Sequence, residues 1–79
     1  MYQEIEVPEV VIMNYHLRIF DKDKQKVILN RYIENEATAV HLYNEQVKIY
    51  HNMSVRVAIT LYDLNKCTNI ESYDSDDNI

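Results

Sequence analysis

The chain has 79 residues, a formal net charge of −5 and 47% hydrophobic residues, with one cysteine and no glycine. This length predicts one small domain, and the hydrophobic fraction excludes wholesale disorder. The lack of glycine excludes phosphate-binding loops, dinucleotide-binding fingerprints and nucleophile elbows, because each needs backbone conformations that glycine supplies. A single cysteine excludes an internal disulfide and a cysteine-only zinc site.

Residues 4–11 are acidic and include the only proline, Pro8. Proline donates no hydrogen bond to a sheet, so this stretch is predicted to be an edge strand or an extended arm. From Val11 to Phe20, apolar side chains alternate with mixed ones, which predicts a strand with one buried face. That buried face is predicted to hold Val11, Met13, Tyr15, Leu17 and Ile19.

A run of charged residues from Asp21 to Lys24 predicts a turn, and residues 26–33 resume a strand pattern. A connection this short favours an antiparallel hairpin, since parallel strands need a long crossover. The predicted buried residues of this second strand are Val27, Leu29 and Ile33. Those predicted on its opposite face are Ile28, Asn30 and Tyr32.

Residues 35–51 carry a helical pattern, because apolar side chains recur at Val40, Tyr43, Val47 and Tyr50. Asn35 is predicted to cap the N-terminus of this helix. Asn52 is predicted to end the helix in the left-handed conformation, which asparagine tolerates better than most residues.

Residues 54–64 alternate with a period of two, which predicts a third strand. Its predicted inward residues are Val55, Val57, Ile59 and Leu61, and its predicted outward residues are Arg56, Ala58, Thr60 and Tyr62. Asn65 and Lys66 are predicted to form a turn before a short last strand over residues 68–73. We therefore predict a single domain over residues 1–73. Residues 74–79 are acidic and nearly without apolar side chains, so we predict a frayed tail there. The sequence shows no internal repeat.

The order β-β-α-β-β predicts an α+β fold, in which a small antiparallel sheet carries one helix on one face. A single helix covers only one side of a sheet, so the other side is the place to expect a partner. This uncovered face is predicted to contain Asn14, His16, Arg18, Ile28, Asn30, Tyr32, Arg56, Ala58, Thr60 and Tyr62.

Two groups of residues have the chemistry of a metal or nucleophile site. His41 and Glu45 are four residues apart and hence neighbours on the predicted helix, and His16 is a third potential ligand. The alternative is a solvated polar pair. Cys67 is a potential nucleophile with His16, His41 or His51 as its base, although a lone cysteine in a turn is more often incidental. We predict that the chain is not an enzyme and holds no metal or cofactor.

No apolar run approaches the roughly 20 residues of a membrane span. Residues 1–4 also lack the basic and then apolar pattern that opens a signal peptide. We expect a cytoplasmic protein with no membrane partner.

Tyrosine and acidic residues are the most informative features for binding. Tyr32 and Tyr62 fall on the uncovered face, where core packing does not explain them, and tyrosine is enriched at binding hot spots. Acidic residues cluster at both chain ends. If the last strand lies near the first, the two clusters form one negative surface that attracts a basic partner; ordinary solvated termini are an equally weighted alternative. The candidate partner-binding residues are Tyr32, Tyr62, Arg18, Arg56, Glu4, Glu6, Asp74, Asp76 and Asp77.

In size, acidity and absence of catalytic, cofactor and targeting motifs, the whole chain resembles the small proteins that bacteriophages and mobile elements encode to block host machinery. These include anti-CRISPR proteins and DNA mimics. The resemblance implies a protein-binding inhibitor that occupies a basic, nucleic-acid-handling host protein by steric and electrostatic means. No residue role is carried over, because no motif of a particular family matches.

Two other functions remain open. A small nucleic-acid-binding module would use Arg18, Arg56, Tyr32 and Tyr62 on one sheet face, but the negative net charge makes direct nucleic-acid binding the less favoured hypothesis. A structural homodimer or larger homo-oligomer would pair two uncovered faces or two strand edges, and association would help so small a domain.

Overall fold

The computed structural model describes residues 12–78. These residues form four strands, one α-helix and a short 3-10 helix. The elements are β1 (Tyr15–Asp21), β2 (Lys26–Ile33), α1 (Glu36–His51), β3 (Val57–Asp63), β4 (Thr68–Asp74) and η1 (Ser75–Asn78). The predicted α+β class and the order β-β-α-β-β are confirmed.

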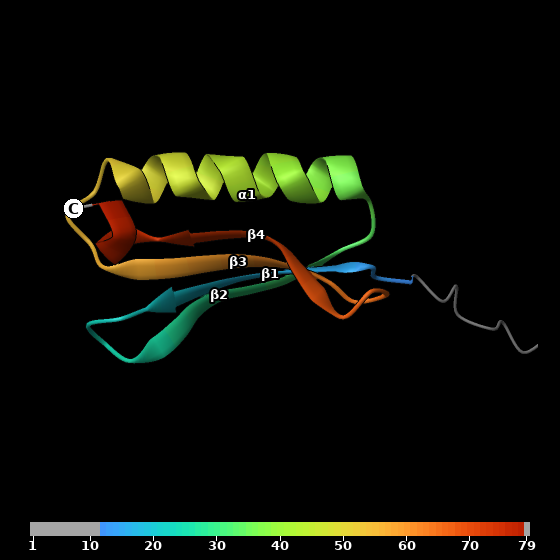
Figure 1. Cartoon of the computed structure of the whole chain (residues 1–79), viewed down its shortest axis with the longest axis horizontal. Helices are drawn as coiled ribbons and strands as arrows, with labels where there is room; N and C mark the ends of the chain where they lie inside the picture. Colours follow the sequence, from blue (N-terminus) through green and yellow to red (C-terminus); the bar gives the residue numbers. More distant parts are fainter. Residues whose placement is uncertain (1–11, 79) are drawn as a thin grey trace, which may run out of the picture.

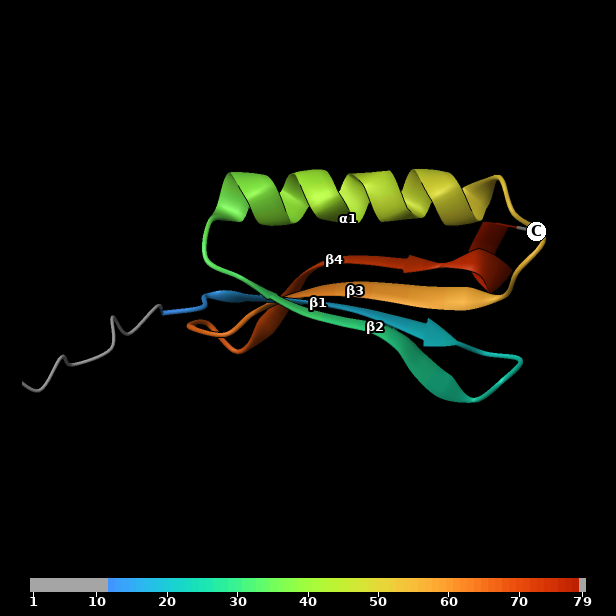
Figure 2. The same ribbon diagram turned by 180° about the vertical axis from the view of Figure 1, so that it is seen from behind.

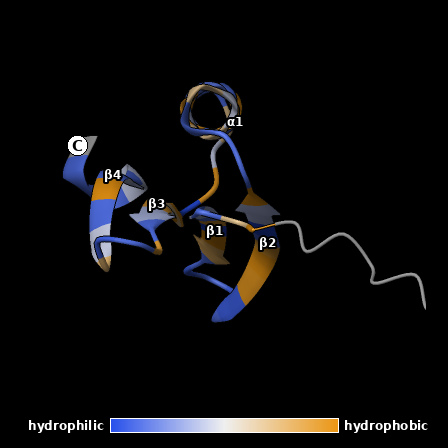
Figure 3. Cartoon of the chain, turned by 90° about the vertical axis from the view of Figure 1, so that its right-hand side faces the viewer, coloured by the Kyte–Doolittle hydropathy of each residue, from blue (hydrophilic) through white to orange (hydrophobic). Residues whose placement is uncertain are grey.

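The four strands form one antiparallel sheet in the order β2-β1-β3-β4. Helix α1 lies along one face of this sheet, as the two opposite side views show (Figures 1 and 2). Seen from the end, the sheet is strongly twisted, and no element covers its other side among residues 12–78 (Figure 3). We call this uncovered side the open face.

The core lies between α1 and the two central strands. Leu17 and Ile19 of β1 face Leu61 and Ile59 of β3, and each of these four side chains is at most 1% exposed. Helix α1 adds Ala39 and Tyr43, both buried. The alternation predicted for β1 and β3 is therefore confirmed, because a strand with one buried face buries every second residue.

The two ends of α1 are closed by asparagines in different ways. The Asn35 side chain accepts a hydrogen bond from the Thr38 N–H at 3.2 Å, which confirms the predicted N-cap. The left-handed conformation predicted for Asn52 is wrong, since its φ and ψ are −87° and −5°. Its side-chain amide instead donates to the Lys48 carbonyl at 3.0 Å, which satisfies a free carbonyl of the last turn without a left-handed residue.

The β1–β2 and β3–β4 hairpins, called the first and second hairpins below, share one turn structure. In the first, the buried carboxylate of Asp21 accepts hydrogen bonds from the N–H groups of residues 23 and 24, each at 3.0 Å. In the second, buried Asp63 accepts from residues 65 and 66 at 2.9 and 3.0 Å. Gln25 and Cys67, the last turn residues, are both left-handed, with φ values of 56° and 54°.

Both hairpins also carry a bulge at the same place. The pairing skips Ile28 in β2 and Ile70 in β4, three residues after each left-handed residue. This shift turns Val27 toward the open face, opposite Phe20, so the prediction that Val27 is buried is wrong and the side chain is 41% exposed. Because β2 and β4 are the edge strands, the bulges also interrupt both edges that another strand might join.

These shared features make the sheet two-fold symmetric in its backbone pattern. The first hairpin and the second are joined through β1 and β3, and their pairing is centred on Arg18 opposite Thr60. These two residues lie at equivalent positions, three residues before Asp21 and Asp63 respectively. The chain therefore contains a structural repeat, contrary to the expectation from the sequence.

The ends of the elements differ from the expectations. The first strand begins at Tyr15, so Met13 precedes it and is 42% exposed rather than buried. The predicted frayed tail is also not what the structure has: Asp74 ends β4, and η1 follows it. The Ser75 hydroxyl accepts a hydrogen bond from the Val57 N–H at 2.9 Å, which joins the start of η1 to β3.

Candidate binding surfaces

An aromatic pair occupies one corner of the open face. The rings of His16 and Tyr32 stack with their centroids 4.6 Å apart and an angle of 17° between the planes. A hydrogen bond between His16 Nε2 and the Asn30 side-chain oxygen holds the imidazole on its other edge. Tyr32 is 52% exposed, so one face of the stack is open to a ligand. We call His16 and Tyr32 the aromatic corner.

Arg18 lies at the centre of the open face. Its guanidinium carbon is 5.8 Å from the centroid of the Phe20 ring, a cation–π arrangement. A shallow hollow of about 220 Å³ lies here, lined by Arg18, Phe20, Ala58 and Thr60. Among residues 12–78, Arg18 forms no ion pair, so its charge is available to an anion from outside.

Tyr62 lies opposite His16 in the register but is less exposed than Tyr32. Burial and a hydrogen bond with Cys67 raise the pKa of its phenol. A side chain that is half-buried and already hydrogen-bonded has less surface to offer. Of the two candidate tyrosines, Tyr32 is therefore the better placed for a partner.

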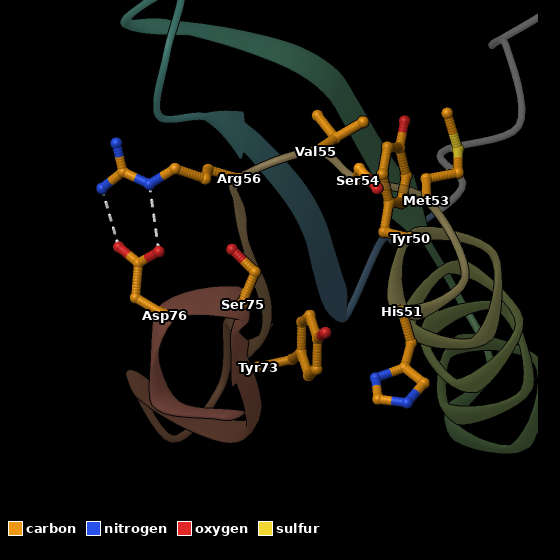
Figure 4. A pocket seen from close by; sticks show the side chains of 9 residues that line it. All are labelled: Tyr50, His51, Met53, Ser54, Val55, Arg56, Tyr73, Ser75 and Asp76. Carbon is orange, nitrogen blue, oxygen red and sulfur yellow. Dashed lines mark hydrogen bonds and ion pairs between the residues drawn. The ribbon is translucent and has the colours of Figure 1, made fainter. Parts of the chain in front are cut away.

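Charged residues from both hairpins form a second corner. Arg56, just before β3, donates to Asp76 from two guanidinium nitrogens at 3.0 and 2.8 Å (Figure 4). It also donates to Asp23 at 3.2 Å. Lys22 bridges the same Asp76, at 2.9 Å, and Asp74. We call these five residues the acidic corner, since three carboxylates share two cations.

These contacts shift the ionisation of the groups involved. The Arg56 guanidinium, and then the Lys22 ammonium, hold the pKa of Asp76 far below its usual range. The Lys22 hydrogen bond also lowers the pKa of Asp74, and its two carboxylate partners raise the pKa of Lys22. Asp74 and Asp76 therefore remain ionised throughout the physiological range, and the corner combines three acidic with two basic side chains.

A pocket of about 430 Å³ lies beside the acidic corner, between the end of α1, the start of β3 and η1 (Figure 4). Tyr50 and Tyr73 face it from α1 and β4, and Arg56 and Asp76 close one side (Figure 4). Its remaining lining residues are His51, Met53, Ser54, Val55 and Ser75. The contacts of the acidic corner thus also fix one wall of this pocket.

The predicted site residues separate into two groups. Arg18, Tyr32 and Tyr62 share the open face as expected. Arg56 does not join them: it is four residues from Thr60, the partner of Arg18, or about 13 Å along an extended chain. Instead it joins Asp74 and Asp76 in the acidic corner, while Asp77 is exposed next to them. Glu4 and Glu6 lie outside the described residues.

The potential metal and thiol sites are not assembled. His41 and Glu45 form the expected pair on α1, 3.2 Å apart, but His16 is on the open face, across the sheet from that helix. Within residues 12–78, no group of three or more histidine, cysteine, aspartate or glutamate side chains is arranged so that it could hold a metal ion. Cys67 is exposed in the β3–β4 turn, and its thiol contacts the Leu64 carbonyl at 3.7 Å rather than a histidine.

Three residues of these candidate surfaces were not among the binding residues predicted from the sequence. Lys22 and Asp23 were assigned to a solvated turn, although the acidic corner depends on both. His16 was placed on the uncovered face, but the only individual roles considered for it were metal ligand and base. His16 lies directly opposite Tyr32 because of the register of the β1–β2 hairpin. The turn at Asp21 sets that register, so the pair could be predicted only with the geometry of this turn in hand.

Comparison with protein-family models, curated proteins and solved structures gave no match to this chain. In the part of the chain that the structure describes, no helix combines the length and the apolar character needed to cross a membrane.

Proposed function

We propose that this chain is a small non-enzymatic protein-binding module, an inhibitor of the phage type, that blocks a nucleic-acid-handling host protein by occupying a basic surface on it. The acidic corner is the contact that we assign to this partner. What supports the proposal is the arrangement of Asp23, Asp74 and Asp76, whose three carboxylates share two cations and are held in place by them.

A surface fixed before binding loses little side-chain freedom when a partner docks, which favours affinity. Negative charge on such a surface also speeds the approach of a basic partner and makes the rate depend on salt. Asp77 is exposed beside the corner and forms no ion pair with residues 12–78. Its negative charge therefore adds to that surface, and its replacement breaks no ion pair among these residues.

The experiment compares two charge reversals of equal size. Asp77→Lys reverses a charge beside the acidic corner, whereas Glu34→Lys changes the β2–α1 connection at the opposite end of the sheet (Figure 1). Each tagged full chain is used to capture proteins from nuclease-treated host lysate, with identification by mass spectrometry. We expect wild type and Glu34→Lys to recover the same nucleic-acid-handling protein, and Asp77→Lys to recover several-fold less.

Reversal of Asp74 or Asp76 is a poorer test, because it also removes the contacts of Lys22 and Arg56 that join η1 to the sheet. Recovery of no partner by the wild-type chain would contradict the proposal. Equal recovery by Asp77→Lys and Glu34→Lys would contradict the role of the acidic corner.

A further inference from the structure

We propose that the aromatic corner and Arg18 form a binding site for single-stranded nucleic acid, with a base stacked on Tyr32 and a phosphate paired with Arg18. This site lies on the open face, away from the acidic corner. It is an activity additional to the protein binding proposed above, and it does not depend on that proposal.

The second hairpin shows that the fold does not require these side chains. It has the same turn, the same bulge and the same pairing as the first hairpin. At the positions equivalent to His16, Arg18 and Tyr32, it carries Ala58, Thr60 and Asp74. A stacked aromatic pair and an unpaired guanidinium are therefore not needed to build such a hairpin, and ligand binding accounts for them better than packing.

The chemistry of the site suits bases and phosphates. The exposed ring of Tyr32 is already stacked on His16, so a base adds a third ring to an ordered stack. The Arg18 guanidinium lies over the Phe20 ring and forms no ion pair with any residue among 12–78. An arginine offers a planar set of donors that matches a phosphate.

A single strand fits this surface better than a duplex. The grooves of B-DNA admit a helix or a two-stranded ribbon, whereas the open face is the side of a four-stranded sheet. A single strand exposes its bases to a flat aromatic surface. The Asn30 and Thr60 side chains, on either side of Arg18, provide hydrogen-bonding groups for the base edges.

The distribution of charge also removes the objection raised by the net charge of the chain. Five of its eight basic residues lie in the first hairpin, and four of these five, all except Lys22, form no ion pair among residues 12–78. The phosphate of a single strand at Arg18 thus meets a locally basic hairpin. The other basic residues of this hairpin are Lys22, Lys24, Lys26 and Arg31.

The test is fluorescence anisotropy of a labelled oligothymidylate of about 15 nucleotides titrated with the full chain. We expect a Kd on the order of 10 to 100 μM at about 50 mM salt, with log Kd rising with log salt at a slope near 1. Tyr32→Ala is expected to weaken binding roughly five-fold or more with the slope kept. Arg18→Gln is expected to weaken it by roughly five-fold and to flatten the slope.

Two matched variants on the helix side serve as controls. Lys48→Gln removes an exposed positive charge, and Ile49→Ala trims a side chain that is 49% exposed. Both are expected to bind as wild type does. Circular dichroism tests whether each variant is folded. If Arg18→Gln does not fold, Arg18→Lys replaces it; this variant keeps the positive charge and is expected to keep the salt slope.

Absence of saturable binding by the wild-type chain at low salt would overturn the proposal. An equal loss in the Lys48→Gln and Arg18→Gln variants would do the same, because it would indicate diffuse attraction. Polyglutamate is included as a competitor. If it displaces the oligonucleotide with higher affinity, the site recognises acidic protein segments instead.

Discussion

The two hairpins share one backbone structure but carry different side chains on the open face. Each has a buried aspartate that organises its turn, a left-handed residue at the end of the turn and a bulge three residues later. On this shared plan, the first hairpin places Tyr32 where the second places Asp74. The two-fold relation puts these residues at opposite corners of the open face, so one corner is aromatic and the other acidic.

This difference separates what the fold requires from what binding requires. Features present in both hairpins, such as the aspartate turns and the bulges, are explained by structure. Features present in one, such as the His16–Tyr32 stack, are not needed for the fold and are the candidates for function.

The largest expected effect tests the shared core. Leu17 and Ile59 occupy equivalent positions, and both are nearly fully buried. Truncation of either to alanine leaves a cavity beneath α1 and is expected to lower the free energy of unfolding by about 2 to 5 kcal/mol. Urea unfolding measures both. A loss below about 1 kcal/mol at one position only would break the equivalence of the two hairpins.

The next effect tests the shared turn. Asp21→Ala and Asp63→Ala each leave two backbone N–H groups without their acceptor. Each substitution is expected to cost about 1 to 3 kcal/mol of unfolding free energy. Similar losses in the two variants support a common turn. A negligible loss in either would show that the aspartate is not what organises that turn.

A pH effect is expected from the acidic corner, where Lys22 of the first hairpin pairs with Asp74 and Asp76. The pKa values of Asp74 and Asp76 are lowered in the folded state, so their contribution to stability is present above the unfolded value of about 3.9 and is lost as pH falls toward the folded values. The pKa of Lys22 is raised, so its contribution is present below about 10.4 and is lost as pH rises beyond that value. The melting temperature is therefore expected to decrease when the pH is lowered below about 4.

The variant Lys22→Leu makes the first turn resemble the second, which has Leu64 at the equivalent position. We expect it to melt lower than wild type at neutral pH and to lose less stability on acidification. Thermal melts at several pH values measure both quantities. The same acid dependence in wild type and Lys22→Leu would contradict the role of this lysine.

The smallest effect concerns the left-handed residues. Gln25 and Cys67 adopt positive φ, which is unfavourable for residues with a Cβ atom and free for glycine. Gln25→Gly and Cys67→Gly are expected to stabilise the chain by up to about 1 kcal/mol each, since relief of strain is partly offset by a more flexible unfolded chain. Chemical denaturation detects this change. Destabilisation by more than about 1 kcal/mol would contradict the strained geometry.

Local patterns explain why most of the fold was predictable. Strict alternation around Leu17 and Ile59 predicted the central strands, and spacing and caps predicted the helix from Asn35 onward. The bulge at Ile28 was not predictable in this way, because it depends on how β2 pairs with β1. One skipped residue was enough to move Val27 from the core to the open face.

The candidate site was predictable only in part. The uncovered face and its Arg18 and Tyr32 followed from alternation. The ordered structure of the C-terminal residues could not be predicted from alternation. It arises from the contacts of Asp76 with Lys22 and Arg56, which are distant from it in the sequence. The repeat was hidden as well, because the hairpins share few identities, among them Asp21 with Asp63, Lys24 with Lys66 and Ile28 with Ile70.

The most direct test of the distinction between the two corners is nuclear magnetic resonance mapping. Backbone amide shifts of the labelled full chain are recorded during titration with oligothymidylate. The account predicts changes concentrated on His16, Arg18 and Tyr32, with little change at Asp74, which occupies the position equivalent to Tyr32. Equal changes at both corners, or changes confined to α1, would contradict it.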